Sequence, residues 1–464
     1  MTAVSSEASS AAAGSGAQAF WTLDRVADAL GSGPRGGAAL GGIATDSRTI
    51  RPGTVFVALK GENFDAHDFL DAAVRAGAAA LIVSRPGVGA TTNVPVFEVP
   101  DTLVALGQLA QYRRRAWGKT VLGITGTNGK TSTKELVKAA LGSVLSVHAT
   151  AGNLNNRIGV PLTLLALPEE ADLAVIEMGT SEPGEIATLR AIAEPDVAIV
   201  SSVAEGHLEG LGDIHGVLVE KASIYEGVSI AIVPAGQPEI GRCAASRARR
   251  VISAGLDSGD LRPTSWGIDA EGLGWIEIDG VTVRPPLRGA HNLRNTMLAL
   301  AAAGECGVSV RDAARGIEAM PVPTMRLAMQ ALGKATLIND AYNANPGSTR
   351  AALELLAHAG PGRQRVAILG TMRELGAHSK RLHEEIAREA IQSSIDLVAG
   401  CGEFQEALEA VGGGDARIVT APDVDELWAK LAPKLQRDAL ILLKASRGVR
   451  LERLVPHLTT WAYR

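Results

Sequence analysis

The sequence is poor in cysteine and in aromatic residues, and it has no long apolar run. Its three cysteines, Cys243, Cys306 and Cys401, lie far apart, which excludes a disulfide scaffold or a zinc ribbon and fits a reducing compartment. No apolar segment approaches the ~18 residues that a membrane helix needs. Aromatic residues make up 3% of the chain, so we expect cores of Ala, Val, Leu and Ile. These absences favour a soluble, cytoplasmic protein.

Neither sign of charge dominates. The chain has 45 Lys and Arg against 50 Asp and Glu, a net charge of −5, and no basic block. We therefore expect neither nucleic acid nor a membrane surface as a partner. Apolar residues reach 46%, which excludes general disorder. Residues 1–19 are rich in Ser, Ala and Gly and lack a basic start with an unbroken apolar segment, so they predict a disordered tail rather than a signal peptide.

Short apolar, β-branched runs recur along the chain, and each is followed by a helix-like stretch. This alternation predicts an α/β fold with parallel sheets covered on both faces. The runs lie at residues 54–59, 80–84, 121–126, 172–179, 197–203, 229–235, 335–340, 365–370, 416–420 and 439–446.

A length of 464 residues suggests about three domains. A basic helix end at residues 111–119 and a proline-containing stretch at 320–324 are the candidate seams. We predict a smaller N-terminal α/β domain over 20–118 and a central parallel-sheet nucleotide-binding domain over 119–319. A C-terminal, Rossmann-like α/β domain is expected over 320–464.

The strongest local motif is GITGTNGKTSTK, residues 123–134, where an apolar strand runs into a glycine-rich loop and then a helix. Glycines let backbone amides converge on a phosphate, and Lys130 would neutralise the terminal phosphates. Thr131 would offer its hydroxyl to Mg²⁺. An ordinary glycine-rich turn is the alternative, because the strict motif spacing would need glycine at Ile124. The candidate ATP-binding residues are Gly126, Thr127, Asn128, Gly129, Lys130, Thr131 and Ser132.

The segment TGTNGKT after an apolar strand resembles the Mur ligases, ATP-dependent enzymes that add amino acids to the peptide stem of the cell-wall precursor. Further segments follow in the family's order from about residue 20 to the end. The resemblance implies a central ATPase domain, a first domain that binds the UDP-linked precursor, and a third domain that closes on ATP and binds the incoming substrate. It also implies ATP and two Mg²⁺ ions as cofactors.

Three residues match positions near the metals of this family. Glu177 ends an apolar strand, where a carboxylate can reach a metal. His207, in EGHLEG, is a Mg²⁺ ligand by resemblance, and a surface or core histidine is the alternative. Lys221 matches the lysine that the family carbamylates, which would turn a cation into a carboxylate-like ligand; a solvated helix lysine is the alternative. Ser223 stands where the family usually has glutamate, and Glu226, three residues later, is the candidate to substitute for it.

Segments around the second seam match the family's adenine, ribose and phosphate contacts. RGAHNLRN begins a helix whose polar residues could contact the edge of an adenine. The alternative is that these polar residues cap the helix. Arg326 could reach the γ-phosphate or pair with a carboxylate, although Met325 replaces the usual glycine. Asp340 follows an apolar strand, as residues that bind ribose hydroxyls do. The implied adenine contacts are His291, Asn292 and Asn295.

The loop INDAYNANPGS, residues 338–348, resembles the branch of the family that adds D-alanyl-D-alanine. LGTMRELGAHSKRLH and LKASRGVRLE support the same branch, with Ala445 in place of glycine. Residues 45–70 resemble the domain that binds the UDP end, with Ala66 in place of glycine. An asparagine cluster at 153–156 also fits a turn with side-chain caps. The implied substrate-binding residues are Ser47, Arg48, Lys60, Asp65, His67, Asn153, Asn155, Asn156, Tyr342, Asn343, Asn345, Lys444, Ser446 and Arg447.

The resemblance thus implies a ligase that joins D-alanyl-D-alanine to UDP-N-acetylmuramoyl-tripeptide through an acyl phosphate and releases ADP and phosphate. A monomer is the default expectation. Lys130, His207 and Lys221 are the candidate catalytic residues. One alternative is another Mur-type ligase, which adds diaminopimelate or lysine to the precursor or glutamate to a folate. The other is a P-loop subunit that binds a nucleotide without ligating anything, and the metal-site candidates argue against it.

Overall fold

The structure is a computed structural model that describes residues 20–463 except for 62–63, 89–91, 323–326 and 361. Each of the ten predicted apolar runs contains a strand, which confirms the predicted α/β class. The predicted disordered tail, and Met325 with Arg326, lie outside the described residues.

The chain divides into two compact units. Unit 1 contains the chain up to Val121, His148–Met178 and Thr188–Pro195. Unit 2 contains Leu122–Val147, Gly179–Ala187 and the chain from Asp196 onward. Among the described residues, no helix is long and apolar enough to cross a membrane.

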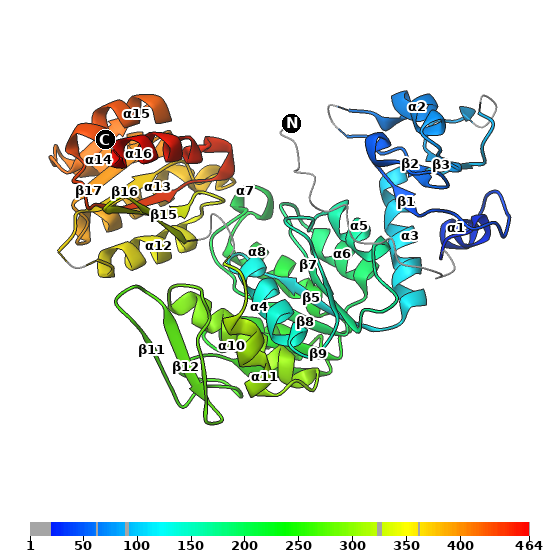
Figure 1. Cartoon of the computed structure of the whole chain (residues 1–464), viewed down its shortest axis with the longest axis horizontal. Coiled ribbons are helices and arrows are strands. Elements are labelled where there is room, and N and C mark those ends of the chain that lie inside the picture. Colours follow the sequence, from blue (N-terminus) through cyan, green and yellow to red (C-terminus); the bar gives the residue numbers. More distant parts are fainter. Residues whose placement is uncertain (1–19, 62–63, 89–91, 323–326, 361, 464) are drawn as a thin grey trace. The chain divides into compact units, whose positions relative to one another are not determined.

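Unit 1 holds a four-stranded parallel sheet in the order β1-β2-β3-β4. Its strands have buried residues on both faces, as in a covered parallel sheet: Val55, Val57 and Ile82 face α1 and α3, whereas Phe56 and Leu81 face α2. Figure 1 shows α2 on one side of these strands and α1 and α3 on the other. The elements are α1 (Leu23–Leu30), β1 (Ile43–Ala44), β2 (Val55–Val57), α2 (Leu70–Arg75), β3 (Ala80–Val83), β4 (Val96–Glu98) and α3 (Thr102–Trp117).

Helix α3 runs through most of the first predicted seam. It begins at the cap residue Asp101 and ends at Gly118, whose φ of 69° suits glycine. Its basic last turns are held in place, because Arg113 donates to the carbonyl of Leu167 at 2.6 Å and Arg114 to that of Ala193 at 3.0 Å. The segments that follow are β6 (Val147–Ala149), α5 (Gly159–Leu165), β7 (Leu173–Glu177) and α6 (Glu185–Ala193).

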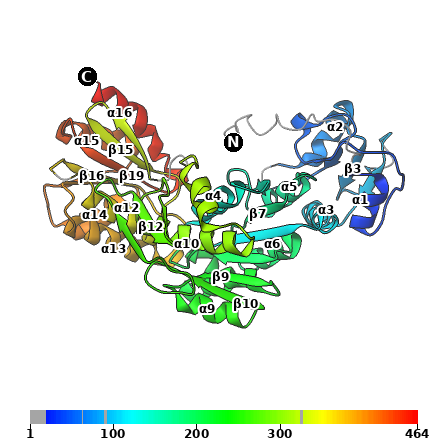
Figure 2. The ribbon, with the colours of Figure 1, turned by 60° about the horizontal axis from the view of Figure 1, so that its bottom comes forward.

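In unit 2, parallel strands lie in the order β10-β9-β8-β5. Helix α9 packs on β9 and β10 (Figure 2), and α10 packs on α4. The elements are β5 (Thr120–Thr125), α4 (Lys130–Gly142), β8 (Val197–Val200), α7 (Leu208–Leu211), α8 (Ile214–Ala222), β9 (Ile230–Pro234), α9 (Pro238–Ala245), β10 (Arg250–Ala254), α10 (Ala290–Glu305) and α11 (Val310–Glu318).

A small antiparallel sheet, whose strands lie between α9 and α10 along the chain, was not predicted from the sequence. It contains β11 (Ser265–Ile268), β12 (Gly274–Ile278) and β13 (Val281–Val283) in that order. Along β12 every second residue is buried, which is the pattern of a sheet with one covered face. A search for continuous apolar runs therefore passes over these strands.

The rest of unit 2 contains a six-stranded sheet in the order β14-β15-β19-β16-β17-β18, parallel except for β14. Helices α15 and α16 cover one face with an apolar core, and α12 packs on the other side of β16 and β19 (Figure 1). The elements are β14 (Ala328–Leu332), β15 (Ala335–Asp340), α12 (Pro346–His358), β16 (Arg365–Leu369), α13 (Ser379–Gln392), β17 (Leu397–Cys401), α14 (Glu403–Gly412), β18 (Ile418–Ala421), α15 (Val424–Leu431), β19 (Leu440–Lys444) and α16 (Leu454–Ala462).

Candidate active site

The glycine-rich loop lies between β5 and α4, as the sequence predicts. Gly129 has φ 79°, and a Cβ there would lie 2.9 Å from the side-chain amide of Asn295. The Nζ of Lys130 donates to the carbonyls of Gly126 at 2.7 Å and Thr127 at 3.1 Å. The loop therefore packs closely on α10 and places a lysine at the N-terminus of a helix, the arrangement that favours phosphate binding.

Lys221 lies in the last turn of α8 and is fully buried. Within the described part of the chain its Nζ has no hydrogen-bond partner. Burial holds the pKa of Lys221 well below its usual value, and the charge of Lys130 lowers it further. A lowered pKa favours the neutral amine, the form whose lone pair can act as a nucleophile.

His207 contacts Glu374, a residue of the LGTMRELGAHSKRLH segment for which the sequence predicts no separate role. The Nδ1 of His207 lies 2.6 Å from Oε2 of Glu374, which comes from the loop after β16. Burial lowers the pKa of His207, whereas Glu374 opposes this effect. The close contact with His207 in turn lowers the pKa of Glu374. The charges of Lys130 and Lys221 lower the pKa of both His207 and Glu374, so the three predicted catalytic residues and Glu374 interact electrostatically.

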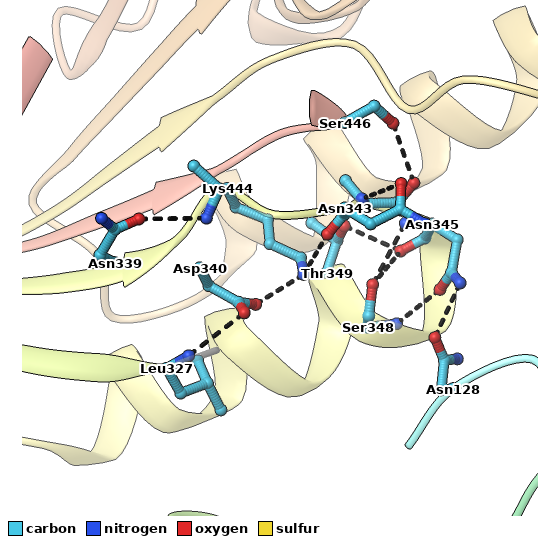
Figure 3. A network of polar contacts seen from close by, with 12 residues as sticks. Asn128, Leu327, Asn339, Asp340, Asn343, Asn345, Ser348, Thr349, Lys444 and Ser446 are labelled. Atoms are coloured by element: carbon cyan, nitrogen blue, oxygen red, sulfur yellow. Dashed lines mark hydrogen bonds and ion pairs between the residues drawn. The ribbon is translucent and has the colours of Figure 1, made fainter. Parts of the chain in front are cut away.

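Asn345 joins the Asp340–Pro346 loop to the glycine-rich loop. Its Nδ2 donates to Oδ1 of Asn128 at 2.7 Å (Figure 3). Its Oδ1 also caps α12 by accepting from the N–H of Ser348 at 2.9 Å. Asn345 therefore serves as a helix cap and as a link between the two loops.

Asp340 and Lys444, predicted as a ribose contact and a substrate contact, bond to each other. Nζ of Lys444 donates to Oδ2 of Asp340 at 2.5 Å and to the carbonyl of Asn343 at 2.9 Å (Figure 3). The other carboxylate oxygen accepts from the N–H of Leu327 at 3.2 Å. Lys444 is 2% exposed, so its charge is balanced inside the protein.

The remaining predicted dipeptide contacts lie around the turn after β19. The guanidinium of Arg447 lies over the ring of Tyr342, 5.5 Å from its centroid. Ser446 is buried; its Oγ accepts from the N–H of Arg373 at 2.9 Å and donates to the carbonyl of Ala344. Ala445, which replaces a glycine of the family pattern, is fully buried in the core.

The predicted adenine contacts stand at the start of α10. Nδ2 of Asn292 donates to the carbonyl of Arg288 at 2.8 Å, and Nδ2 of Asn295 donates to Oδ1 of Asn292 at 3.2 Å. His291 lies beside Asn292, with 3.2 Å between Nε2 and Nδ2. Helix α10 begins after Gly289 without a side-chain cap, so the capping alternative is wrong for these residues, and Asn295 packs against the glycine-rich loop at Gly129.

In unit 1, Glu177 is buried at the end of β7 and accepts from Nδ2 of Asn155 at 2.7 Å. Oδ1 of Asn156 accepts from the N–H groups of residues 158 and 159, which is the capping role weighed for this cluster. Asn153 is exposed. The structure thus brings Asn155 to Glu177 and gives Asn156 a local structural role.

The predicted UDP contacts in unit 1 are engaged in local networks. Arg48 forms a two-pronged pair with Asp46. Asp65 forms an isolated β-bridge with Lys60. Its Oδ1 lies 2.6 Å from Nδ1 of the buried His67. Nε2 of His67 accepts from the N–H of residue 84 at 2.9 Å. Ala66 is buried and starts a short 3₁₀ turn, so this turn forms without glycine. Ser47 begins the 3₁₀ turn that Asp46 caps.

Comparison with known families gives matches along most of the chain. A Mur ligase family catalytic domain matches residues 40–114, a Mur ligase middle domain matches 124–303, and a Mur ligase glutamate ligase domain matches 325–447. These three successive matches agree with the predicted three-domain α/β fold.

Relatives of known activity and structure cover nearly the whole chain. The UDP-N-acetylmuramoyl-tripeptide–D-alanyl-D-alanine ligases of Bacillus subtilis and Escherichia coli are both 36% identical, over 90% and 94% of this chain and 93% and 97% of theirs. A crystal structure of MurF from Acinetobacter baumannii has a TM-score of 0.87 at 31% identity and covers 95% of this chain and 99% of its own. MurF from Thermotoga maritima, in complex with ADP, has a TM-score of 0.80 at 30% identity over 91% and 97%. On this similarity of sequence and structure, the chain belongs to the Mur ligase family.

Proposed function

We propose that this chain joins D-alanyl-D-alanine to UDP-N-acetylmuramoyl-tripeptide at the expense of ATP in peptidoglycan precursor synthesis. The observation that carries the proposal is the bond between Asn345 and Asn128, 2.7 Å long. It holds the Asp340–Pro346 loop, whose sequence is typical of the dipeptide-adding branch, against the glycine-rich loop. The names of the Bacillus subtilis and Escherichia coli relatives support the same activity.

The glycine-rich loop fits the phosphates of ATP. Its glycines hold conformations that a side chain would strain, Gly126 at φ 146° and Gly129 at 79°, and Lys130 lies at the head of α4. ATP supplies the phosphoryl group that turns the tripeptide's terminal carboxylate, a poor electrophile, into an acyl phosphate. Lys130 would offset charge on the transferring group. The proposed ATP contacts are residues 126–132, His291, Asn292, Asn295, Arg326 and Asp340.

The residues around Lys221 fit Mg²⁺ only with a modified lysine. Among the described residues, no three His, Cys, Asp or Glu side chains gather as a metal site. A carbamate on Lys221 would add the missing oxygens, and its buried, partnerless Nζ with a lowered pKa suits reaction with CO₂. The proposed metal contacts are Thr131, Glu177, His207 and the carbamate of Lys221.

The carbamate has its own test. Lys221→Ala should lose activity, and formate or acetate should partly restore it by filling the vacated anionic site. Lys221→Arg should stay inactive under the same additions, because the guanidinium keeps its charge and fills the space. Full activity of Lys221→Arg with CO₂ rigorously removed would contradict the carbamate.

Substrate roles for the other predicted residues follow the family pattern. We assign the UDP-precursor to the first domain, over 20–118, through Ser47, Arg48, Lys60, Asp65 and His67. Asn153, Asn155 and Asn156 would lie near the tripeptide. The C-terminal domain, over 320–464, would bind the dipeptide through Tyr342, Asn343, Asn345, Lys444, Ser446 and Arg447. The nucleotide substrates favour a cytoplasmic enzyme, and a monomer is our default expectation.

An acceptor screen tests the activity. ADP release should require ATP, UDP-N-acetylmuramoyl-tripeptide and D-alanyl-D-alanine together. Release with diaminopimelate, lysine or another single amino acid on a shorter precursor would point instead to another Mur-type ligase. Nucleotide binding without release of ADP under any acceptor would point to a non-catalytic P-loop subunit.

A further inference from the structure

Two loops of unit 2 meet at His207 and Glu374. His207 immediately precedes α7, and Glu374 lies in the loop between β16 and α13. These loops belong to different sheets, yet the imidazole and the carboxylate are 2.6 Å apart. The backbone N–H of Glu209 also donates to the carbonyl of Glu374 at 3.1 Å. The contact thus joins the central sheet to the C-terminal sheet beside Lys130 and Lys221.

Both ends of this contact have unusual backbone conformations. His207 has φ 56° and Glu374 has φ 64°, in the left-handed region that residues other than glycine rarely adopt. Two residues on, Gly376 has φ 53°, and a Cβ there would lie 3.0 Å from Cα of Glu209. Such conformations cost free energy and persist only where neighbouring structure holds them. Their concentration at one contact points to a functional role.

The loop that carries Glu374 is anchored independently of His207. The ring of His383 is buried, and its Nε2 accepts from the N–H of Met372 at 2.9 Å. Nδ1 of His383 donates to the carbonyl of Ser379 at 2.8 Å. Ser446 accepts from the N–H of Arg373 at 2.9 Å. Glu374 therefore follows two residues whose backbone N–H groups are bonded to α13 and to the turn after β19.

A carboxylate at Nδ1 has a defined effect on an imidazole. It accepts the Nδ1 proton, fixes the tautomer and the ring orientation, and leaves the Nε2 lone pair for a metal or a proton. We propose that Glu374 is a positioning residue: supplied by the C-terminal domain, it sets the tautomer of His207, so that the reaction centre is complete only when the two sheets meet. The inference rests on the proposed ligase function for its kinetic consequences alone.

The tautomer can be measured directly. In protein labelled with ¹⁵N-histidine, the His207 signals, identified by their loss in His207→Gln, should report a protonated Nδ1 and an unprotonated Nε2. Glu374→Ala should shift the ring towards the Nε2-protonated form that free histidine favours. Glu384→Gln, a carboxylate change on α13 in the same domain, is the matched control, because Glu384 pairs with Arg388. Unchanged His207 signals in Glu374→Ala would overturn the proposal.

Kinetics provide the second measurement. Removal of a carboxylate behind a functional histidine typically lowers activity by about 10- to 100-fold. We expect Glu374→Ala to lower kcat in this range with little change in KM for ATP, and Glu374→Gln to retain more activity, because its carbonyl still accepts from Nδ1. Equal kcat for Glu374→Ala and Glu384→Gln would also overturn the proposal. If the parent protein releases no ADP with D-alanyl-D-alanine, the ligase function fails, while the ¹⁵N signals still test the contact.

Discussion

Replacement of Glu220 should loosen the first turn of α6 and disturb Lys221, its neighbour in α8. Glu220 is 6% exposed. Its carboxylate accepts from the N–H of Gly184 at 2.7 Å, the N–H of Ile186 at 2.7 Å and the hydroxyl of Thr180 at 3.3 Å. It thereby satisfies N–H groups at a helix start that have no partner within the helix. It also places a negative charge at the positive end of the helix dipole.

The size of the effect follows from these contacts. A hydrogen bond to a charged group contributes about 1.5–3 kcal/mol, and a buried donor without an acceptor costs about 1–3 kcal/mol. Ile186 is fully buried, so its N–H cannot turn to water, whereas the surroundings of Gly184 are more exposed. We therefore expect Glu220→Ala to lower the local stability of this turn by about 2–4 kcal/mol. Glu220→Gln should lower it less, since one of its two acceptor oxygens remains.

Hydrogen exchange at single amides measures this effect. With about 1.4 kcal/mol for each tenfold change, the Ile186 amide should exchange roughly 30- to 1,000-fold faster in Glu220→Ala. Ligase activity should fall with it. Glu226→Gln is the control, because the side chain of Glu226 is 64% exposed and lies 3.7 Å from Arg247. If Ile186 exchanges at the parent rate in Glu220→Ala, this account of the turn is wrong.

Three further predictions address the loop, the link and the pH response. Lys130→Ala should lower turnover by at least ~10²-fold with unchanged thermal stability, since a loop lysine contributes to charge stabilisation rather than to a core; near-normal turnover would exclude this loop as the ATP site. Asn345→Asp should keep the cap of α12 but lose the donor to Asn128, so KM for the dipeptide should rise at constant Tm, whereas Asn345→Ala should also cost about 1 kcal/mol of helix stability. Burial, with the charges of Lys444 and Arg294, lowers the pKa of His291 to about 4. Between about pH 6.5 and 4 the unfolded chain therefore binds a proton that the folded chain does not, so Tm should fall as the pH is lowered through this range. His291→Gln removes the titrating group and should make Tm depend less on pH there.

Local patterns predicted the strands and the glycine-rich loop because both depend on neighbouring residues. A continuous apolar run such as β19 is buried along its whole length, so its composition alone indicates a covered strand. The alternating residues of β12 give a weaker signal, and that sheet was missed. Local sequence was also a poor guide to the carboxylate near Lys221, where the family pattern has a glutamate. Ser223 occupies its position, and the buried carboxylate of this turn is Glu220 rather than the exposed Glu226.

Pairs that are distant in the chain could not be predicted from sequence. Asp340 and Lys444 are 104 residues apart, and each was assigned to a different ligand although they bond to each other. His207 was singled out by its motif, but nothing local indicates that Glu374 reaches its Nδ1. The strand order, in which β19 lies beside β15, brings Asp340 and Lys444 together, whereas His207 and Glu374 meet where loops of two different sheets come into contact.

This strand order also explains why one edge of the C-terminal sheet carries the site. Strands β15, β19 and β16 are parallel neighbours, so their carboxyl ends lie at one edge, where ligands of open α/β sheets bind. Asp340 ends β15, Lys444 ends β19, and the Glu374 loop follows β16. The central sheet presents its own carboxyl ends in the same way, with the glycine-rich loop after β5 and His207 after β8. Because Asn345 bonds to Asn128 and Glu374 contacts His207, the two edges meet, and neither sheet alone contains all of the groups that we propose for the ligation.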